Sequence, residues 1–249
     1  MGMVIALIAG AATSPVSAEW FLDIYAGQSF MEDTDVDIST DDVQVPGVDV
    51  LRGNLQDVEV DDFTSFGLRV GHWFESVPNV GLALDVSRFA PDVGAQTVRG
   101  NANASFSADI LDNPINFRVG ANRNVRIPNE DIPATLVISP LEFMVRRPLL
   151  VTEAVPDGRL KPYLTAGPAF LITSAAPDAA LGVKAGAGII WQLSDRVGIF
   201  GEYRFTYFDV DTQTGGVNIA GVETGDLDIE ADFNTYHIVA GLSVGLGKT

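Results

Sequence analysis

One stretch of the chain, residues 181–210, limits the possible folds more than any other. Its two arms of alternating residues are joined by the short turn at 194–196. Alternation with period 2 is typical of a β-strand with two different faces, so the stretch predicts a β-hairpin. In both arms one face is apolar, while the other carries glycines together with Lys184, Glu202 and Arg204.

The glycines indicate which face meets which environment. A soluble barrel would turn the charges to water, but a water-facing strand gains nothing from Gly182, Gly186, Gly188 and Gly198, because glycine weakens a strand. The crowded interior of a small barrel does need small residues beside large ones. We therefore expect the glycine-and-charge face to line a barrel and the apolar face to meet lipid, as in a transmembrane β-barrel.

Composition is compatible with this interpretation and argues against other classes. The 249 residues carry a net charge of −18 but have a positive mean hydropathy of +0.21, which an apolar belt with acidic loops reconciles. Such acidity argues against a nucleic-acid partner, which needs basic stripes. The absence of cysteine excludes disulfides and thiol catalysis, and two histidines argue against a multi-histidine zinc site.

Residues 1–18 have the features of a secretory signal peptide. An apolar run leads to a small-residue ending at 16–18, which predicts cleavage before Glu19. A membrane helix is the alternative, but the run is too short and contains Pro15. Residues 19–249 would then form one outer-membrane β-barrel domain.

Eight segments alternate as membrane-spanning strands should. They are residues 20–30, 63–74, 80–89, 136–147, 160–173, 181–193, 197–210 and 234–246. Connections are short on one side and mostly long on the other, and the longest covers residues 90–135. Trp20, Trp73 and Trp191 fall at strand ends on the short-turn side, where an aromatic girdle is expected.

Three segments resemble small outer-membrane barrels of the OmpA-like, OmpX-like and opacity-protein-like families. These segments are FGLRVGHWFESVPNVGLALDVSRF, LKPYLTAGPAFLIT and VGIFGEYRFTY, the last containing the GEYR segment at 201–204. The resemblance implies an all-β fold, an eight-stranded antiparallel up-and-down transmembrane β-barrel with long extracellular loops. It also implies location in the outer membrane of a Gram-negative envelope, periplasmic termini, and contact with outer-membrane lipid and lipopolysaccharide.

Alternation places a set of charged residues inside the barrel. They are Asp23, Arg69, Asp85, Glu142, Arg146, Lys184, Glu202 and Arg204. A filled, charge-balanced interior is the usual solution in so small a barrel, because unpaired buried charge is costly. A pore or proton path would use the same residue types, so a narrow porin-like channel is an alternative.

A lipid-acting hydrolase is the second alternative, and the histidines give it little support. A hydrolase needs a hydroxyl nucleophile beside a base that an acid orients. His237 points inward, but its neighbour on that face is Val239 rather than a serine or threonine. His72 falls on the lipid-facing side as a rim residue. We therefore expect no enzymatic activity.

The acidic loops are the remaining candidate site. Residues 31–62 contain eleven carboxylates against one arginine, and residues 209–232 contain seven and no base. The carboxylates alternate, which predicts strands that continue above the membrane. Candidate ligands for weakly bound Ca²⁺ are Asp57, Glu59, Asp61, Asp226, Asp228 and Glu230. Their spacing matches no EF-hand, so a solvated acidic rim is the alternative.

The longest loop carries the basic residues on this side, Arg99, Arg118, Arg123 and Arg126. A connection this long is expected to form local strands or a cap, and we expect it to fold across the barrel mouth toward the acidic loops. The sequence as a whole predicts a monomeric, non-enzymatic outer-membrane barrel without a cofactor, apart from the weak Ca²⁺. Its acidic loops would mediate contact with an extracellular ligand or support envelope integrity.

Overall fold

The structure is a computed structural model. It describes residues 19–40, 48–89, 92–110, 113–127, 130–131, 135–152, 157–173, 179–214, 218–219, 222–223 and 226–248. The predicted signal peptide at 1–18 lies outside these residues. Within the described ranges, no helix has the length and apolar character needed to cross a membrane.

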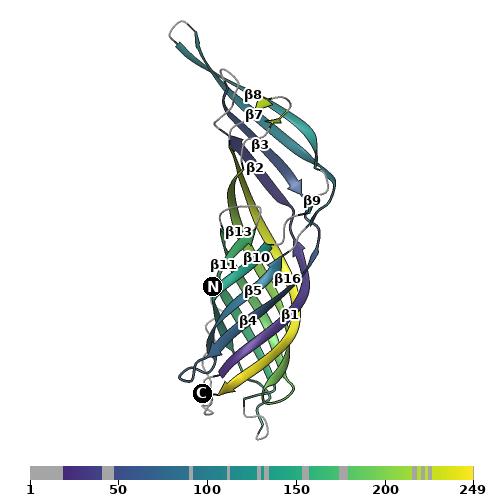
Figure 1. Cartoon of the computed structure of the whole chain (residues 1–249), viewed down its shortest axis with the longest axis vertical. Helices are drawn as coiled ribbons and strands as arrows, with labels where there is room; N and C mark the ends of the chain where they lie inside the picture. The colour runs from purple at the N-terminus through teal and green to yellow at the C-terminus, as the bar shows by residue number, and fades with distance from the viewer. Residues whose placement is uncertain are drawn as a thin grey trace.

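Eight strands close into a barrel (Figure 1). They are β1 (Glu19–Met31), β4 (Phe63–Trp73), β5 (Val80–Phe89), β10 (Thr135–Arg146), β11 (Leu160–Thr173), β12 (Ala180–Gln192), β13 (Val197–Thr214) and β16 (Leu227–Lys248). Each is antiparallel to the next, and β1 pairs with β16 from Glu19–Lys248 to Met31–Thr235. Closure satisfies the backbone polar groups, which lipid cannot do. The predicted fold class is confirmed.

The two faces of the barrel wall differ as the alternation predicts. On β1, Asp23 and Tyr25 are buried inside, whereas Ile24 between them is 51% exposed on the outside. The large outward side chains of the other strands repeat the pattern, among them Leu68, Leu84, Phe143, Leu164, Val183, Ile199 and Ile238. So large an apolar belt suits lipid rather than water.

The tryptophan girdle is only partly as predicted. Trp20 and Trp191 lie on the outer surface, and Trp20 contacts the outward ring of His72. The prediction is wrong for Trp73, which is 2% exposed inside the barrel and stacks on Phe21. Trp73 is an even number of residues from Arg69 in β4, and such residues lie on the same face of a strand, so both side chains point inward.

A bulge in β10 resets the alternation halfway along the strand. Pairing with β5 is interrupted between Ser139 and Glu142, and Pro140 and Leu141 both point outward. An extra residue is what a β-bulge inserts. Ser139 above the bulge and Glu142 below it can therefore both point into the barrel, where each is fully buried.

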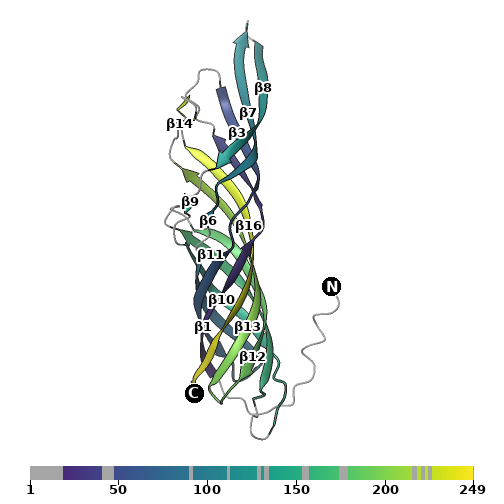
Figure 2. The same ribbon diagram turned by 90° about the vertical axis from the view of Figure 1, so that its right-hand side faces the viewer.

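Above the barrel the same sheet continues as an open extension of the wall (Figures 1 and 2). β13 and β16 stay paired up to Thr214 and Leu227. Four further strands add in the order β2 (Thr34–Thr40), β3 (Val48–Val58), β7 (Gln96–Ile110) and β8 (Asn113–Ile127). We call these strands, with β13 from Asp209 and β16 up to Asp232, the outer sheet.

Two short pairs, β6 (Asp92–Val93) with β9 (Glu130–Asp131) and β14 (Asn218–Ile219) with β15 (Val222–Glu223), complete the described strands. The alternating carboxylates of β2 and β16 do lie on strands above the barrel. The longest loop reaches the acidic strands, because β7 pairs with β3, but the prediction that it crosses the mouth is wrong. It forms the β7–β8 hairpin instead, which extends the sheet away from the barrel.

The belt generates a first prediction. Leu84→Arg places a charge on the outer face of β5, where Leu84 is 45% exposed. We expect the free energy of unfolding to fall by about 2–4 kcal/mol if the site lies near the bilayer midplane. Urea titration of protein folded in liposomes measures it.

Val77→Arg is the matched control, because Val77 is 51% exposed in the short turn before β5. Equal losses for both variants would contradict a lipid-facing belt.

Candidate functional site

A cluster of buried charges occupies the middle of the barrel, with Arg69 at its centre. On the paired strands β1, β4 and β5, Asp23, Arg69 and Asp85 lie side by side in one row. Nε of Arg69 is 3.2 Å from Asp85 Oδ2 and 3.0 Å from Glu142 Oε2, and Nη2 is 2.9 Å from Glu202 Oε2. Asp23 is more distant, 3.5 Å from Nη1. Four strands therefore deliver carboxylates to one guanidinium.

Two further cations share the same carboxylates. Nζ of Lys184 lies 3.0 Å from Asp85 Oδ1 and 3.3 Å from Glu142 Oε1. Nε of Arg204 lies 2.8 Å from Glu202 Oε1. The structure thus brings seven of the eight predicted lumen residues into one cluster, with four acids and three bases.

Two tyrosine hydroxyls donate hydrogen bonds to carboxylates of the cluster. Tyr25 donates to Asp85 Oδ1 and Tyr163 to Glu202 Oε2, each at 2.7 Å. Hydrogen bonds to ionised groups are stronger than neutral ones. Sequence reasoning did not single out either residue, although inward parity and an aromatic hydroxyl were the available signals.

Glycines leave the space that the cluster fills. A Cβ at Gly188 would lie 2.5 Å from the ring of Tyr163, and a Cβ at Gly186 would lie 3.0 Å from Glu202 Oε1. A larger residue at Gly188 would displace Tyr163 from the cluster. Small residues here therefore serve packing, as the hairpin pattern predicts.

Apolar layers close the interior above the charges and below them. One cluster contains Phe21, Trp73, Met144, Ile190 and Phe200, and reaches the short-turn end. The other contains Phe63, Phe89, Val137, Ala169 and Phe208, and lies toward the outer sheet. The charged layer is thus enclosed by buried apolar side chains at both ends.

Arg146 does not join the cluster. Its guanidinium stacks 4.1 Å from the Trp73 ring, reaches Glu19 at 3.6 Å and donates to the carbonyl of Pro78 at 3.2 Å. Arg146 is the last residue of β10, so it lies at the short-turn rim rather than at the level of Arg69. Its inclusion in one network with the other seven is corrected.

His237 has hydroxyl neighbours that the sequence did not reveal. Ser29 faces it across the closing pair β1–β16, with Oγ 2.7 Å from Nδ1, and Thr206 Oγ1 lies 3.0 Å from Nε2. Ser29 also donates to Ser65 at 3.0 Å. Both ring nitrogens are occupied by hydroxyls, so no carboxylate orients the ring as a catalytic triad requires.

The proposed Ca²⁺ ligands do not come together. Asp57, Glu59 and Asp61 belong to the end of β3 and the connection after it, whereas Asp226, Asp228 and Glu230 belong to β16 and the residue before it, and β2 lies between the two strands. Within the described part of the chain, no three acidic or histidine side chains form a group that could hold a metal. Many carboxylates in two loops therefore do not make one site, because the structure keeps the two sets apart.

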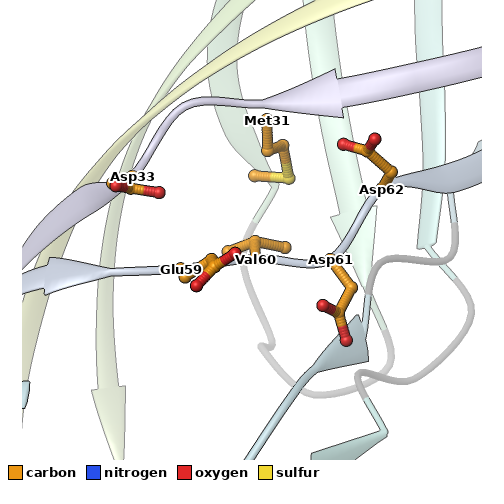
Figure 3. A pocket seen from close by; sticks show the side chains of 6 residues that line it. All are labelled: Met31, Asp33, Glu59, Val60, Asp61 and Asp62. Atoms are coloured by element: carbon orange, nitrogen blue, oxygen red, sulfur yellow. The ribbon is translucent and has the colours of Figure 1, made fainter. Parts of the chain in front are cut away.

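An acidic cleft lies where the barrel meets the outer sheet (Figure 3). Its volume is about 630 Å³, and it is lined by Met31, Asp33, Glu59, Val60, Asp61 and Asp62. Asp33 comes from the β1–β2 connection, and the last four come from the β3–β4 connection. The carboxylates are spread around the opening rather than converging on one point.

The geometry defines the class of protein. A closed antiparallel barrel with an apolar outer belt and a charged interior is built as outer-membrane β-barrels are. The first residue of β1, Glu19, pairs with the last residue of β16, Lys248, at the short-turn end of the barrel, as in that class. The chain has the fold of a transmembrane β-barrel of the outer-membrane type.

Several solved structures match the chain at low sequence identity. The outer membrane protein OprG from Pseudomonas aeruginosa is 12% identical with a TM-score of 0.47, covering 92% of this chain and 97% of that one. The outer membrane protein AlkL is 13% identical with a TM-score of 0.43, covering 96% and 95%. Neisserial surface protein A is 11% identical with a TM-score of 0.35, covering 88% and 96%. No protein-family model and no curated protein matches the chain.

The cluster generates a second prediction. Glu202→Gln removes the carboxylate that Arg69, Arg204 and Tyr163 share. We expect a loss of about 3–5 kcal/mol in the free energy of unfolding, because two buried cations lose a countercharge. Urea titration in liposomes measures the loss.

Glu75→Gln is the control, since Glu75 is exposed in the short turn after β4. A Glu202→Gln barrel as stable as wild type would show that the ion pairs contribute little.

Proposed function

We propose that this protein is a non-enzymatic outer-membrane barrel with a sealed interior, whose outer sheet is the working surface. The buried cluster around Arg69 carries the proposal. Its members Arg69, Asp85, Glu142 and Lys184 are at most 1% exposed, and apolar layers lie at both ends. A barrel filled in this way serves as an anchor rather than a passage.

The outer sheet supports the second half of the proposal. Its strands continue from the barrel wall through β13 and β16, so the barrel holds it directly at the cell surface. Its charged side chains are exposed, among them Asp37, Glu230 and Arg99. Contact with an extracellular ligand or with other envelope components would use this surface.

A narrow channel is the alternative function, and measurements of conductance test it. We expect the wild-type protein to show no stable conductance in planar bilayers, because desolvating an ion past paired charges and aromatic layers is costly. Glu202→Gln should likewise fail to open a stable pore. A triple variant, Arg69→Ala with Glu202→Ala and Lys184→Ala, removes side-chain bulk and is the positive control. Steady wild-type currents would overturn the sealed anchor.

Hydrolysis is the second candidate that a specific observation favours, namely the Ser29–His237 contact. Against it, Ser29 is fully buried, and His237 meets Thr206 where a triad has an acid. We expect no turnover of phospholipid or lipid A in detergent micelles, and no difference between wild type and His237→Ala. Turnover lost in both His237→Ala and Ser29→Ala would establish an enzyme.

A further inference from the structure

One face of the outer sheet continues the lipid-facing surface of the barrel. Along β13, the outward residues Tyr203, Phe205 and Tyr207 are followed on the same face by Asp209 and Asp211. Along β16, outward Ile238 and Tyr236 are followed in the same way by acidic residues. We call this side of the outer sheet the outer face. Like the lipid-facing side of the barrel, it is directed away from the barrel axis, toward neighbouring molecules in the membrane.

Strand register arranges the outer face in straight rows. One row crosses all six strands through Asp211, Glu230, Asp37, Asn54, Asn101 and Asn122. The next row on this face runs through Gln213, Asp228, Ser39, Arg52, Asn103 and Gly120. In the first row the carboxylates occupy one end and the amides the other, and in the second row Asp228 lies toward the first end and Arg52 toward the second.

Charge divides this face into two halves. The half on β13, β16 and β2 carries the exposed carboxylates Asp209, Asp211, Glu230, Asp232 and Asp37. The half on β3, β7 and β8 carries the exposed guanidinium groups Arg52, Arg99 and Arg126. By register, Arg99 and Arg126 have the same parity as the amides of their strands, so both belong to the outer face.

Among the described residues, none forms an ion pair with a carboxylate of the acidic half. Asp211, Glu230 and Asp37 are direct cross-strand neighbours, and like charges in such positions are destabilising. Neutral groups provide hydrogen bonds there: Asn54 donates to Asp37, Gln213 to Asp228 and the Tyr207 hydroxyl to Asp232, each at 2.8 Å. An opposite charge supplied from outside would stabilise these rows.

We propose that the outer face binds the same face of a second copy of this chain, related by a two-fold axis along the membrane normal. Rotation by 180° about that axis keeps both barrels upright in one membrane. It also lays the acidic half of each copy on the basic half of the other. Two-fold pairing is the commonest symmetry of homo-oligomers. The inference rests on the proposed function of the outer sheet, and it departs from the expected monomer.

The dimensions predict a weak contact. Six strands about 4.8 Å apart, with about six residues each at roughly 3.3 Å, cover about 500 Å² per copy. Stable interfaces bury about 800 Å² per partner, so the pair should be transient. Charge complementarity then supplies orientation and a strong dependence on salt. Confinement in a bilayer raises the local concentration enough to detect it.

Cross-linking tests the geometry directly. The chain has no cysteine, so Asn54→Cys introduces a single thiol near the centre of the outer face. Packed sheets lie about 10 Å apart, which favours a short bis-maleimide over a disulfide. We expect a covalent dimer in liposomes that diminishes at high salt. Ala121→Cys, exposed on β8 and of opposite parity, should give little dimer.

Charge reversal tests complementarity in the Asn54→Cys background. Arg99→Glu with Arg126→Glu gives the basic half a net negative charge, and Asp211→Lys with Glu230→Lys replaces two carboxylates of the acidic half with cations. Each variant alone should cross-link roughly tenfold less, because exposed ion pairs across the two-fold become repulsive. Mixing the two in one liposome should restore the dimer. Heat-modifiability on gels confirms that each variant is folded.

The outcomes separate this inference from the proposed function. Absence of an Asn54→Cys dimer, equal cross-linking through Ala121→Cys, or failure of the mixture to recover would overturn the two-fold pair. Ladders of higher oligomers would also overturn it, because edge-to-edge pairing of β8 with β13 gives chains rather than dimers. None of these results bears on conductance, so a sealed barrel could be right while the pair is wrong.

Discussion

The ion pairs around Arg69 constrain the rest of the barrel. Charges enclosed by a wall that faces lipid need partners, because the desolvation penalty of an unpaired ion is several kcal/mol. The partners arrive from separate strands, with Asp23 on β1, Asp85 on β5, Glu142 on β10 and Glu202 on β13. Strand order and register therefore have to be right together. A slip of one residue in any of these strands would turn its carboxylate into the bilayer.

β10 shows how strongly the cluster acts on the backbone. Inward residues above the bulge have odd numbers, and continuing that parity would point Glu142 at lipid. The bulge at Pro140 and Leu141 shifts the parity just where the carboxylate is needed. Proline has no N–H to lose from the ladder, and Gly167 on β11 accommodates the displaced carbonyl of Leu141 because it has no Cβ. A local irregularity thus satisfies a global charge requirement.

Sequence patterns predict what depends on alternation and miss what depends on register. Alternation alone predicts that Asp23, Arg69 and Lys184 point into the barrel. It predicts the same for Trp73, but that residue was assigned to the aromatic girdle because it lies at a strand end. The contact of Ser29 with His237 depends on closure of the first strand on the last, which no local pattern contains. Local strands were one expectation for residues 90–135, but the bounds and pairing of β7 and β8 were not predicted because their Asn, Ala and Gly residues alternate little in hydropathy. The six candidate Ca²⁺ ligands do not form one site because they lie on separated strands.

The boundary between barrel and outer sheet is chemical rather than structural. β13 and β16 run through it without a break, and the change from apolar to acidic falls at Tyr207 and Tyr236. Their hydroxyls donate to Asp232 at 2.8 Å and to Glu32 at 3.0 Å, the first carboxylates above the belt, and the Tyr236 ring packs against the outward rings of Tyr203 and Phe205. Aromatic side chains with a polar end suit an interface between lipid and water. Because both strands pass through this interface as continuous hydrogen-bonded pairs, the orientation of the outer sheet follows that of the barrel. The outer face is therefore held parallel to the membrane normal. A partner in the same membrane can contact it only if that partner also extends as far above the lipid.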